Sequence, residues 1–461
     1  LGDVYKRQDK SYIHRPPPSL ICGPSRPAPS TLGAGQFIPY GKVLHGYSRK
    51  MTNDSFFKKH PLALAIQIPA FGFLMLGASV AHATINLVGG ETRTIAPGYH
   101  KDSWFIKEKS HLISNGAALL QSQLVGSRMT LNEGTKAQDI QASAGSKVTL
   151  NGTTVEARNA SAFAIHLTNS DADITNSSVT SKNGVGISAG RNFLTSDGST
   201  VNVFGSTITG SSMGAIATAF SQLNFFDSDV TATSESGIGI RLVGGDATAI
   251  GSRIVGGENG VRLQAESVDL NSSTLVLDNS SVEGKTGAAL VVAGRASGGA
   301  IADIQVLNGS TLTGGNGNIL ELTGGSFANM NVDGSTLFGD VVVEEGSTAT
   351  LQLNNGSWLT GQLKNVAELS VNNASHWALV GDSEVGDLKM AGGSVHFGGP
   401  NEFYRLDVDS LSGDGTFVMH TDFGSGQTDL LAVNGIAEGN HSLLLAATGS
   451  ELSLIHISEP T

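Results

Sequence analysis

A short phrase that returns at regular intervals constrains the fold of this chain more than any other feature. The clearest copy is IQVLNGSTLTG, residues 304–314, which reads as strand, Asn/Asp-Gly-Ser turn, strand. Aligned on the residue before the Ser or Thr of the turn, the copies fall at positions 152, 176, 205, 227, 251, 279, 309, 334 and 356, so successive marks lie 22 to 30 residues apart. A period of that length predicts a solenoid, whose repeats bury their apolar faces only by stacking on one another.

Inside each phrase the apolar residues alternate with polar ones, as Ile304, Val306 and Leu312 show, which is the period of a half-buried strand. The Ser beside the turn mark, such as Ser310, is expected to be exposed. A further strand is predicted in Gly-flanked apolar runs that follow most turns, at residues 184–190, 237–245, 260–266, 287–294 and 317–325. Two or three strands per coil, separated by Gly and Asn that accept left-handed backbone angles, predict an all-β chain folded as a right-handed parallel β-helix.

Charge and cysteine content narrow the class of protein. The sequence of 461 residues holds a single cysteine, Cys22, so it is not a disulfide scaffold. From Thr84 onward there are 18 Lys and Arg against 37 Asp and Glu, a net charge near −19. This acidity argues against nucleic acid and anionic membrane surfaces as partners.

The start of the chain differs from the rest. Residues 1–50 are basic, Pro-rich and without strand alternation, and we interpret them as non-native upstream translation without order of its own. Residues 51–83 have the pattern of a signal peptide: a Lys pair, a long apolar run and a small-residue box. Cleavage is predicted between Ala83 and Thr84. A retained membrane helix is the alternative, but the small-residue box and the β-rich continuation favour removal.

The remainder divides into four segments. Residues 84–145, with weaker periodicity, are expected to form an N-terminal cap and the first coils. Residues 146–364 carry the regular coils of the parallel β-helix. Residues 365–450 have a different texture, and residues 451–461 are interpreted as an artefactual tail.

The run from Asn372 to Phe397 and the run from Phe403 to Glu451 closely resemble the C-terminal passenger segment of pertactin-family autotransporters. The matching positions are Trp377, Leu388, Gly392-Gly393, Phe397, Leu411-Ser412-Gly413, Gly415-Thr416-Phe417, Asp429-Leu430-Leu431, Val433, Gly435, Gly439-Asn440-His441, Leu444 and Gly449-Ser450. The resemblance implies a β-helical passenger whose last part assists folding during export, and a C-terminal barrel that anchors it in the outer membrane. The chain stops near Glu451, so we expect it to be truncated before that barrel.

Aromatic residues are almost twice as frequent in residues 372–450 as in residues 84–371. The segment holds Trp377, Phe397, Phe403, Tyr404, Phe417 and Phe423. Because aromatic side chains bury the largest areas, this segment is predicted to form the most stable core per residue and to fold first.

Two serine motifs resemble those of catalytic nucleophiles. Gly381-Asp382-Ser383 resembles a hydrolase motif, but Glu384 follows it and no helix is predicted to hold the Ser. The stretch from Gly210 to Ala215 resembles a protease serine loop without its Thr and Pro. Both are interpreted as turns, since a triad needs converging partners as well as a motif.

Acidic and imidazole side chains give no clear site either. The recurrent acids Asp227, Asp229, Asp278 and Asp333 sit in the repeated turn, where other coils have Asn or Gly, so a turn requirement explains them. The Gly-rich stretch 314–318 lacks the Asp of a calcium-binding repeat. The histidines lack the spacing of zinc ligands; they are His166, His376, His396, His420 and His441. No cofactor, metal site or catalytic residue is therefore predicted, and the binding residues are left unassigned.

The sequence thus predicts a non-enzymatic adhesin or interaction protein, monomeric and virulence-associated by family resemblance. It would be exported through the inner membrane to the periplasm and then displayed at the cell surface or outer membrane, where it would contact host-cell, matrix or bacterial surface ligands. The alternative is a secreted β-helical polysaccharide lyase or hydrolase, since one fold hosts many functions. A groove where several carboxylates and a basic residue converge would distinguish the enzyme.

Overall fold

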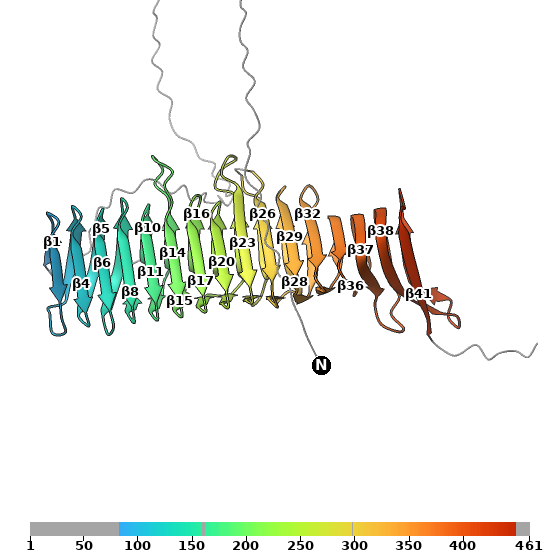
Figure 1. Ribbon diagram of the computed structural model, residues 1–461, viewed down its shortest axis with the longest axis horizontal. Coiled ribbons are helices and arrows are strands. Elements are labelled where there is room, and N and C mark those ends of the chain that lie inside the picture. The colour runs from blue at the N-terminus through green and yellow to red at the C-terminus, as the bar shows by residue number, and fades with distance from the viewer. Residues whose placement is uncertain (1–82, 159–161, 297, 449–461) are drawn as a thin grey trace, which may run out of the picture. The chain divides into compact units, whose positions relative to one another are not determined.

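The structure is a computed structural model that describes residues 83–158, 162–296 and 298–448. The predicted upstream segment 1–50, the predicted signal peptide apart from Ala83, and the predicted tail 451–461 lie outside these residues. Within them every helix or strand assigned is a strand, and Figure 1 shows the strands stacked one after another from β1 to β41. No helix in the described part of the chain has the length and apolar character needed to cross a membrane.

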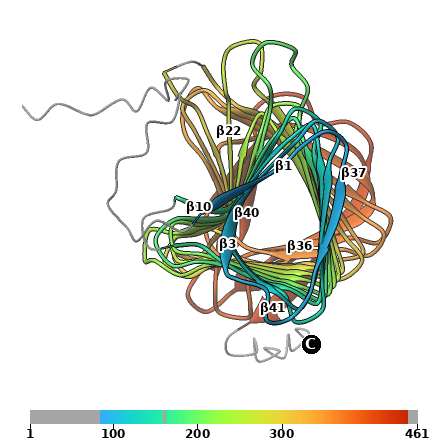
Figure 2. The ribbon, with the colours of Figure 1, turned by 90° about the vertical axis from the view of Figure 1, so that its left-hand side faces the viewer.

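Each coil in the middle of the stack consists of three strands, and equivalent strands of successive coils pair in parallel. The three sets of strands form three faces around the interior, which Figure 2 shows along the stack. The predicted all-β fold, a parallel β-helix with two or three strands per coil, is confirmed. Each Gly-flanked apolar run predicted as a strand contains a strand of the third face.

The strands of the three faces have the following bounds. Face 1 holds β2 (Thr92–Ile95), β4 (His111–Asn115), β6 (Arg128–Asn132), β8 (Lys147–Asn151), β11 (Asp171–Thr175), β14 (Thr200–Phe204), β17 (Gln222–Phe226), β20 (Asp246–Ile250), β23 (Ser272–Asp278), β26 (Ile301–Leu307), β29 (Phe327–Asp333), β32 (Thr348–Asn354) and β35 (Val366–Asn372). Face 2 holds β9 (Thr154–Glu156), β12 (Ser178–Ser181), β15 (Thr207–Gly210), β18 (Asp229–Ala232), β21 (Arg253–Gly256), β24 (Ser281–Gly284) and β27 (Thr311–Gly314), followed by β30 (Thr336–Phe338), β33 (Trp358–Thr360) and β36 (His376–Leu379). Face 3 holds β1 (Thr84–Leu87), β3 (Asp102–Lys107), β5 (Ala118–Val125), β7 (Lys136–Ser143), β10 (Phe163–Thr168), β13 (Val185–Gly190), β16 (Met213–Thr218), β19 (Ile238–Val243), β22 (Asn259–Gln264), β25 (Leu290–Ala293), β28 (Asn318–Thr323), β31 (Asp340–Val343) and β34 (Leu363–Lys364).

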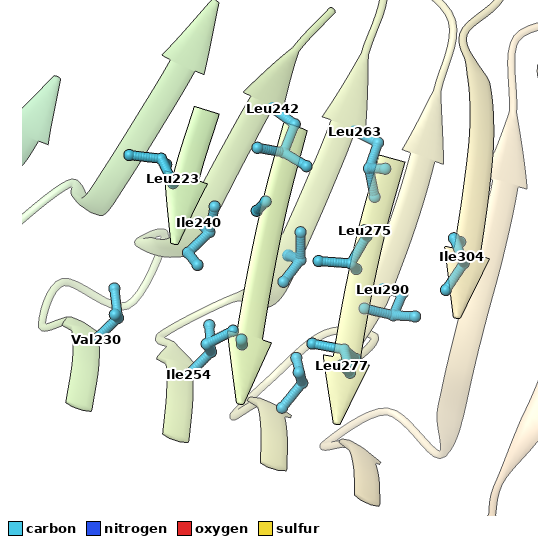
Figure 3. Close-up of a cluster of buried hydrophobic side chains, with 14 of the residues drawn as sticks. Leu223, Val230, Ile240, Leu242, Ile254, Leu263, Leu275, Leu277, Leu290 and Ile304 are labelled. Carbon is cyan, nitrogen blue, oxygen red and sulfur yellow. The ribbon is translucent and has the colours of Figure 1, made fainter. Parts of the chain in front are cut away.

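Alternating apolar side chains form continuous columns in the interior, because each residue stacks on its register partner in the next coil. One column along face 1 consists of Leu223, Ala247, Leu275, Ile304, Met330, Leu351, Leu369, Leu388 and Leu411, all of them buried. Figure 3 shows three of these residues among the buried side chains of the central coils. Burial of a Leu or Ile side chain stabilises the fold by about 1.5–3 kcal/mol, so the stack is held together mainly by these columns.

The turn between faces 1 and 2 explains the repeated phrase. All nine turn marks have positive φ angles, between 47° and 82°, and all are Gly, Asn or Asp. These residue types accept the left-handed region at the least cost. The period of the sequence is therefore the period of this turn.

The Ser or Thr after each mark corrects one prediction, because Ser310, expected to be exposed, is fully buried. Its Oγ accepts a hydrogen bond from the Ser280 N–H (3.0 Å) and donates one to the Leu307 carbonyl (2.7 Å). Equivalent bonds link the neighbouring coils from Thr153 to Ser280. Buried backbone groups at a turn need partners, and a hydroxyl that points inward supplies both a donor and an acceptor.

The end of the stack is built from longer strands. β37 (Ser383–Phe397) and β38 (Arg405–Asp422) have 15 and 18 residues and pair in parallel. β40 (Leu430–Val433) and β41 (Asn440–Thr448) then pair in parallel with β38, and the short β39 (Gln427–Thr428) pairs antiparallel with it. Two long strands thus take the place of several short ones.

Candidate interaction face

Two loops stand out at the corner where the chain passes from face 3 to face 1. They are residues 191–199, before β14, and residues 265–271, before β23. In Figure 1 the loops before β14 and β23 rise above the neighbouring corners. The corners of the two intervening coils are tight, at residues 219–221 and 244–245. We define the lateral loop face as residues 191–199, 219–220 and 265–271.

The first loop is held by its own hydrogen bonds. The Leu194 N–H donates to Asn192 Oδ1 (2.9 Å), the Ser196 N–H to the Asn192 carbonyl (2.8 Å), and the Asn192 N–H to the Asp197 carbonyl (2.8 Å). Asn side chains favour turns of this kind because they mimic a backbone acceptor two residues away. The loop therefore has a defined conformation although it projects from the stack.

An ion pair joins the two loops across the coils between them. Arg191 Nε and Nη2 donate to Glu266 Oε1 at 3.0 and 2.7 Å, and Glu266 Oε2 accepts the Ala219 N–H at 3.1 Å. The Arg191 and Glu266 side chains are only 12% and 17% exposed. Removing one partner of such a shielded pair leaves an uncompensated charge, so the pair fixes the loops relative to each other.

Apolar side chains of the lateral loop face are exposed to solvent, and two of them lie against the ion pair. Leu194 is 95% exposed, Phe193 72%, Val268 70% and Phe220 56%. The Arg191 guanidinium lies 4.5 Å from the Phe193 ring centroid and 6.0 Å from that of Phe220, within the range of cation–π attraction. Grouped exposed apolar residues mark interaction sites, and aromatic residues with Arg are enriched at their centres.

The spacing of the sequence repeat contains a signal for these loops, although no binding residue is assigned from the sequence. The marks at 176 and 205 are 29 residues apart and those at 251 and 279 are 28 apart, whereas 205 and 227 are only 22 apart. These two intervals contain the two projecting loops, while the interval from 279 to 309 is longer still, at 30 residues, and has its extra residues between β25 and β26. Extra residues in a repeat that leave the core columns intact must be accommodated at a corner.

The serines weighed as nucleophiles occupy structural positions. Ser383 is buried, its Oγ accepts the Leu363 N–H (3.2 Å) and it donates to the Gly381 carbonyl (3.1 Å). Gly210 ends β15, and Gly214 and Ala215 belong to β16. Both motifs therefore sit at corners and strands of the stack.

The acidic residues are also used in turns. Asp278 Oδ1 accepts the side-chain amide of Asn308 (2.8 Å), and Asp333 Oδ2 accepts that of Asn355 (2.8 Å). Asp227 occupies a turn mark with φ 47°. Asp229 begins β18, where it pairs in register with Thr207 of β15.

A groove of about 270 Å³ near the end of the stack brings three carboxylates together, those of Glu384, Asp387 and Asp409. None of the residues that line it is basic. Lys389, on the same strand as two of the acids, is bonded to Glu368 at 2.7 Å. This arrangement lacks the converging basic residue expected of a lyase or hydrolase.

Two of the scattered histidines meet in space. His376 Nδ1 and His396 Nε2 lie 2.5 and 2.8 Å from the Ser394 Oγ, and both rings lie beside Trp358, at centroid distances of 4.5 and 5.4 Å. The pKa of His396 is lowered by burial and then by the nearby charges of His376 and His420. Among the described residues, no group of three or more His, Cys, Asp or Glu side chains could hold a metal ion.

The predicted cleavage site lies at the beginning of the described chain. Thr84 begins β1, which pairs in parallel with β3, and Ala83 precedes it. The cleavage itself stays a prediction.

Comparison with known proteins identifies the end of the stack. The family model described as Pertactin matches residues 385–454, a range that begins within β37 and includes β38 to β41. The C-terminal segment of this chain is therefore similar to the passenger segment of pertactin-family autotransporters. The BrkA autotransporter of Bordetella pertussis is 36% identical over 77 residues, which cover 14% of this chain and 8% of that protein. The pertactin-like segment does not include the lateral loop face.

Proposed function

We propose that this chain is the surface-displayed passenger of an autotransporter, that it acts as an adhesin, and that the lateral loop face contacts the ligand. The observation that carries this proposal is the group of four exposed apolar side chains braced by the shielded Arg191–Glu266 pair. The relation to pertactin-family passengers supports display at the cell surface.

In this proposal residues 51–83 direct export, with cleavage between Ala83 and Thr84, and residues 84–450 form the displayed part. A C-terminal barrel of the same gene product would anchor it in the outer membrane. The passenger would act as a monomer whose ligands lie on host cells, matrix or other bacteria, which associates it with virulence.

The mechanism is display by a stiff support. The core columns and the three paired faces fix the position of each corner, so a loop at a corner is presented without movement of the stack. Because the hydrogen bonds of residues 191–199 and the ion pair to Glu266 already order the loops, binding loses little further conformational entropy. A small apolar patch on ordered loops can thereby support specific contact.

The proposal is tested with beads coated with the purified full chain and added to cultured epithelial cells and to immobilised matrix protein. Changing Phe193, Leu194 and Phe220 together to Ser should lower adherence by about tenfold or more, because the anchors of an interface carry most of its binding energy. The matched control is Phe338→Ser, since Phe338 is also exposed, at 66%, but lies on face 2. That variant should adhere like the unchanged chain.

Two results would contradict the proposal. Equal adherence of the triple variant and the unchanged chain would place the contact elsewhere on the stack. Adherence by none of the proteins, with circular dichroism showing that they are folded, would point to a supporting role without adhesion.

A further inference from the structure

Three arginines form a row on the outer side of face 3, next to the lateral loop face. Arg241 of β19 is in register with Arg262 of β22, and Arg262 is in register with Val291 of β25. Arg295 follows the end of β25 by two residues. Neighbouring strands lie about 4.8 Å apart, so Arg241 and Arg262 stack directly on each other in successive coils, whereas Arg295 belongs to the next coil but lies four residues beyond the register partner Val291.

The charges of this row are not neutralised within the described part of the chain. Arg241 Nε donates to the neutral side-chain oxygen of Gln264 at 3.0 Å. Arg262 Nε is inaccessible to solvent and has no hydrogen-bond partner. By contrast, Arg253 of β21, on face 2 of the same part of the stack, is bonded to the Glu283 carboxylate at 2.7 Å.

The arginines also act on one another. Burial lowers the pKa of Arg241, and the positive charges of Arg295 and Arg262 lower it further, whereas no carboxylate offsets them. A guanidinium nevertheless stays protonated at neutral pH. The chain therefore holds like positive charges together on a body whose net charge from Thr84 onward is near −19.

We propose that Arg241, Arg262 and Arg295 bind an acidic polysaccharide through its sulfate or carboxylate groups. An oxyanion would relieve the repulsion between the three guanidinium groups, through the charge-assisted hydrogen bonds that such groups form best at the edges open to solvent. A row with one arginine per coil fits a linear polymer whose charges also repeat. The acidity of the rest of the chain disfavours an anionic membrane, which would meet a wide surface of like charge.

The proposal is tested by fluorescence anisotropy on the purified full chain. The probes are a labelled heparin-derived oligosaccharide, a carboxylate-only oligogalacturonate, neutral dextran and single-stranded DNA. The unchanged chain should bind at least one acidic oligosaccharide and not dextran. Arg241→Gln with Arg262→Gln should raise Kd by about tenfold or more and reduce the slope of log Kd against log salt by about two, one for each lost charge.

Matched variants separate this site from general charge effects. Arg253→Gln removes the same charge on face 2 and should change Kd by less than about twofold, because the Arg253 guanidinium is already paired with Glu283. Arg262→Lys should keep the salt slope while weakening binding, since Lys lacks the planar fork. The Phe193, Leu194 and Phe220 triple variant should bind the oligosaccharide unchanged, so this test can fail independently of the adherence test.

Three results would overturn the proposal. It fails if the unchanged chain binds neither acidic oligosaccharide, if Arg253→Gln weakens binding as much as the double variant, or if single-stranded DNA binds more tightly than both. Circular dichroism checks that the double variant is folded. If it is not, Arg295→Gln, a change at an exposed position, should still weaken binding measurably.

Discussion

The coils of residues 146–364 and the segment of residues 365–448 use the same parallel stack but distribute their residues differently. In the coils, strands of two to seven residues alternate with corners, and inward-pointing hydroxyls stabilise the turns. In the C-terminal segment, β37 and β38 pair at twelve residue positions without a separate corner between faces. The coils therefore have corners where loops can be inserted. In the C-terminal segment most residues are instead used in long paired strands.

Because of this difference, the segment that is similar to known proteins is not the segment that we propose to bind ligands. The family match covers residues 385–454, where long paired strands leave little freedom to vary. The lateral loop face and the arginine row lie in the coils, outside that match. The part of the molecule that reveals its relatives is thus distinct from the part proposed to contact ligands.

The largest effect should come from deleting residues 372–450, which we expect to leave the remaining coils largely unfolded. The reason is that parallel coils pair residues far apart in sequence and form slowly without a template, which the long β37–β38 pairing can supply. The measurement is β-sheet circular dichroism per residue, together with limited proteolysis at intermediate denaturant. Proteolysis of the full chain should leave a protected fragment that begins near Asn365.

The control for this deletion is the removal of residues 84–157 from the other end, which should leave the rest folded. An unchanged signal per residue in the C-terminal deletion, or a protected fragment that maps to residues 146–300, would place the template in the coils instead.

Not all six aromatic side chains of residues 372–450 contribute to the core of this segment. Trp377 and Phe397 are fully buried and Phe417 nearly so, but Phe423 is 57% exposed. Trp377 is also anchored, since its indole N–H donates to the Gly361 carbonyl at 3.0 Å. The template is better explained by strand length and these three buried rings than by all six aromatics.

Much of the fold could be predicted from the sequence because one local requirement repeats. A positive φ angle selects Gly, Asn or Asp at every mark, and alternation selects the apolar columns on either side. The burial of Ser310 was missed because alternation describes strands, and at the turn the hydroxyl points inward to satisfy backbone groups.

The candidate site could not be predicted in the same way. Arg191 and Glu266 are 75 residues apart and meet only because the intervening coils are stacked in a particular register. His376 and His396 likewise meet through the pairing of β36 with β37. Contacts between coils depend on the length of every coil between them, which spacing alone does not determine.

The next largest effect is the loss of stability expected from substitutions in the repeated turn between faces 1 and 2. Gly309 has φ 82° and open space where a side chain would go, so Gly309→Val should cost about 1–3 kcal/mol through backbone strain alone. Gly309→Asn should be nearly neutral, because Asn176 and Asn279 occupy the same turn position with φ 48°. Urea unfolding measures both.

Because Ser310 is buried, Ser310→Val should also cost about 1–3 kcal/mol, as it leaves the Ser280 N–H without a partner. The exposed neighbour Thr311 provides the control, and Thr311→Val should change stability by less than about 0.5 kcal/mol. If Gly309→Asn proved as costly as Gly309→Val, the turn would not require a left-handed backbone.

The smallest expected effect is on the pH dependence of stability, and it differs between a histidine in the coils and one in the C-terminal segment. Burial lowers the pKa of His166 below its ordinary value of 6.5, and burial followed by the charges of His376 and His420 lowers that of His396. In the unfolded chain both groups bind a proton at a higher pH than in the folded chain. The folded state is therefore fully favoured above about pH 6.5 and loses stability as the pH falls below it, towards the lowered pKa values.

Melting temperatures measured between about pH 7.5 and about pH 5.5 should accordingly fall, and the fall should be smaller in His166→Gln and in His396→Gln. His166 responds to burial alone, so raising the salt concentration should leave its contribution unchanged. The contribution of His396 should shrink with salt, because part of its shift comes from neighbouring charges that salt screens. The exposed His100→Gln serves as the control and should follow the unchanged chain. If both histidines responded equally to salt, the charges of neighbouring histidines would not contribute to the pKa shift of His396. The two regions would then not differ in how their histidines affect stability.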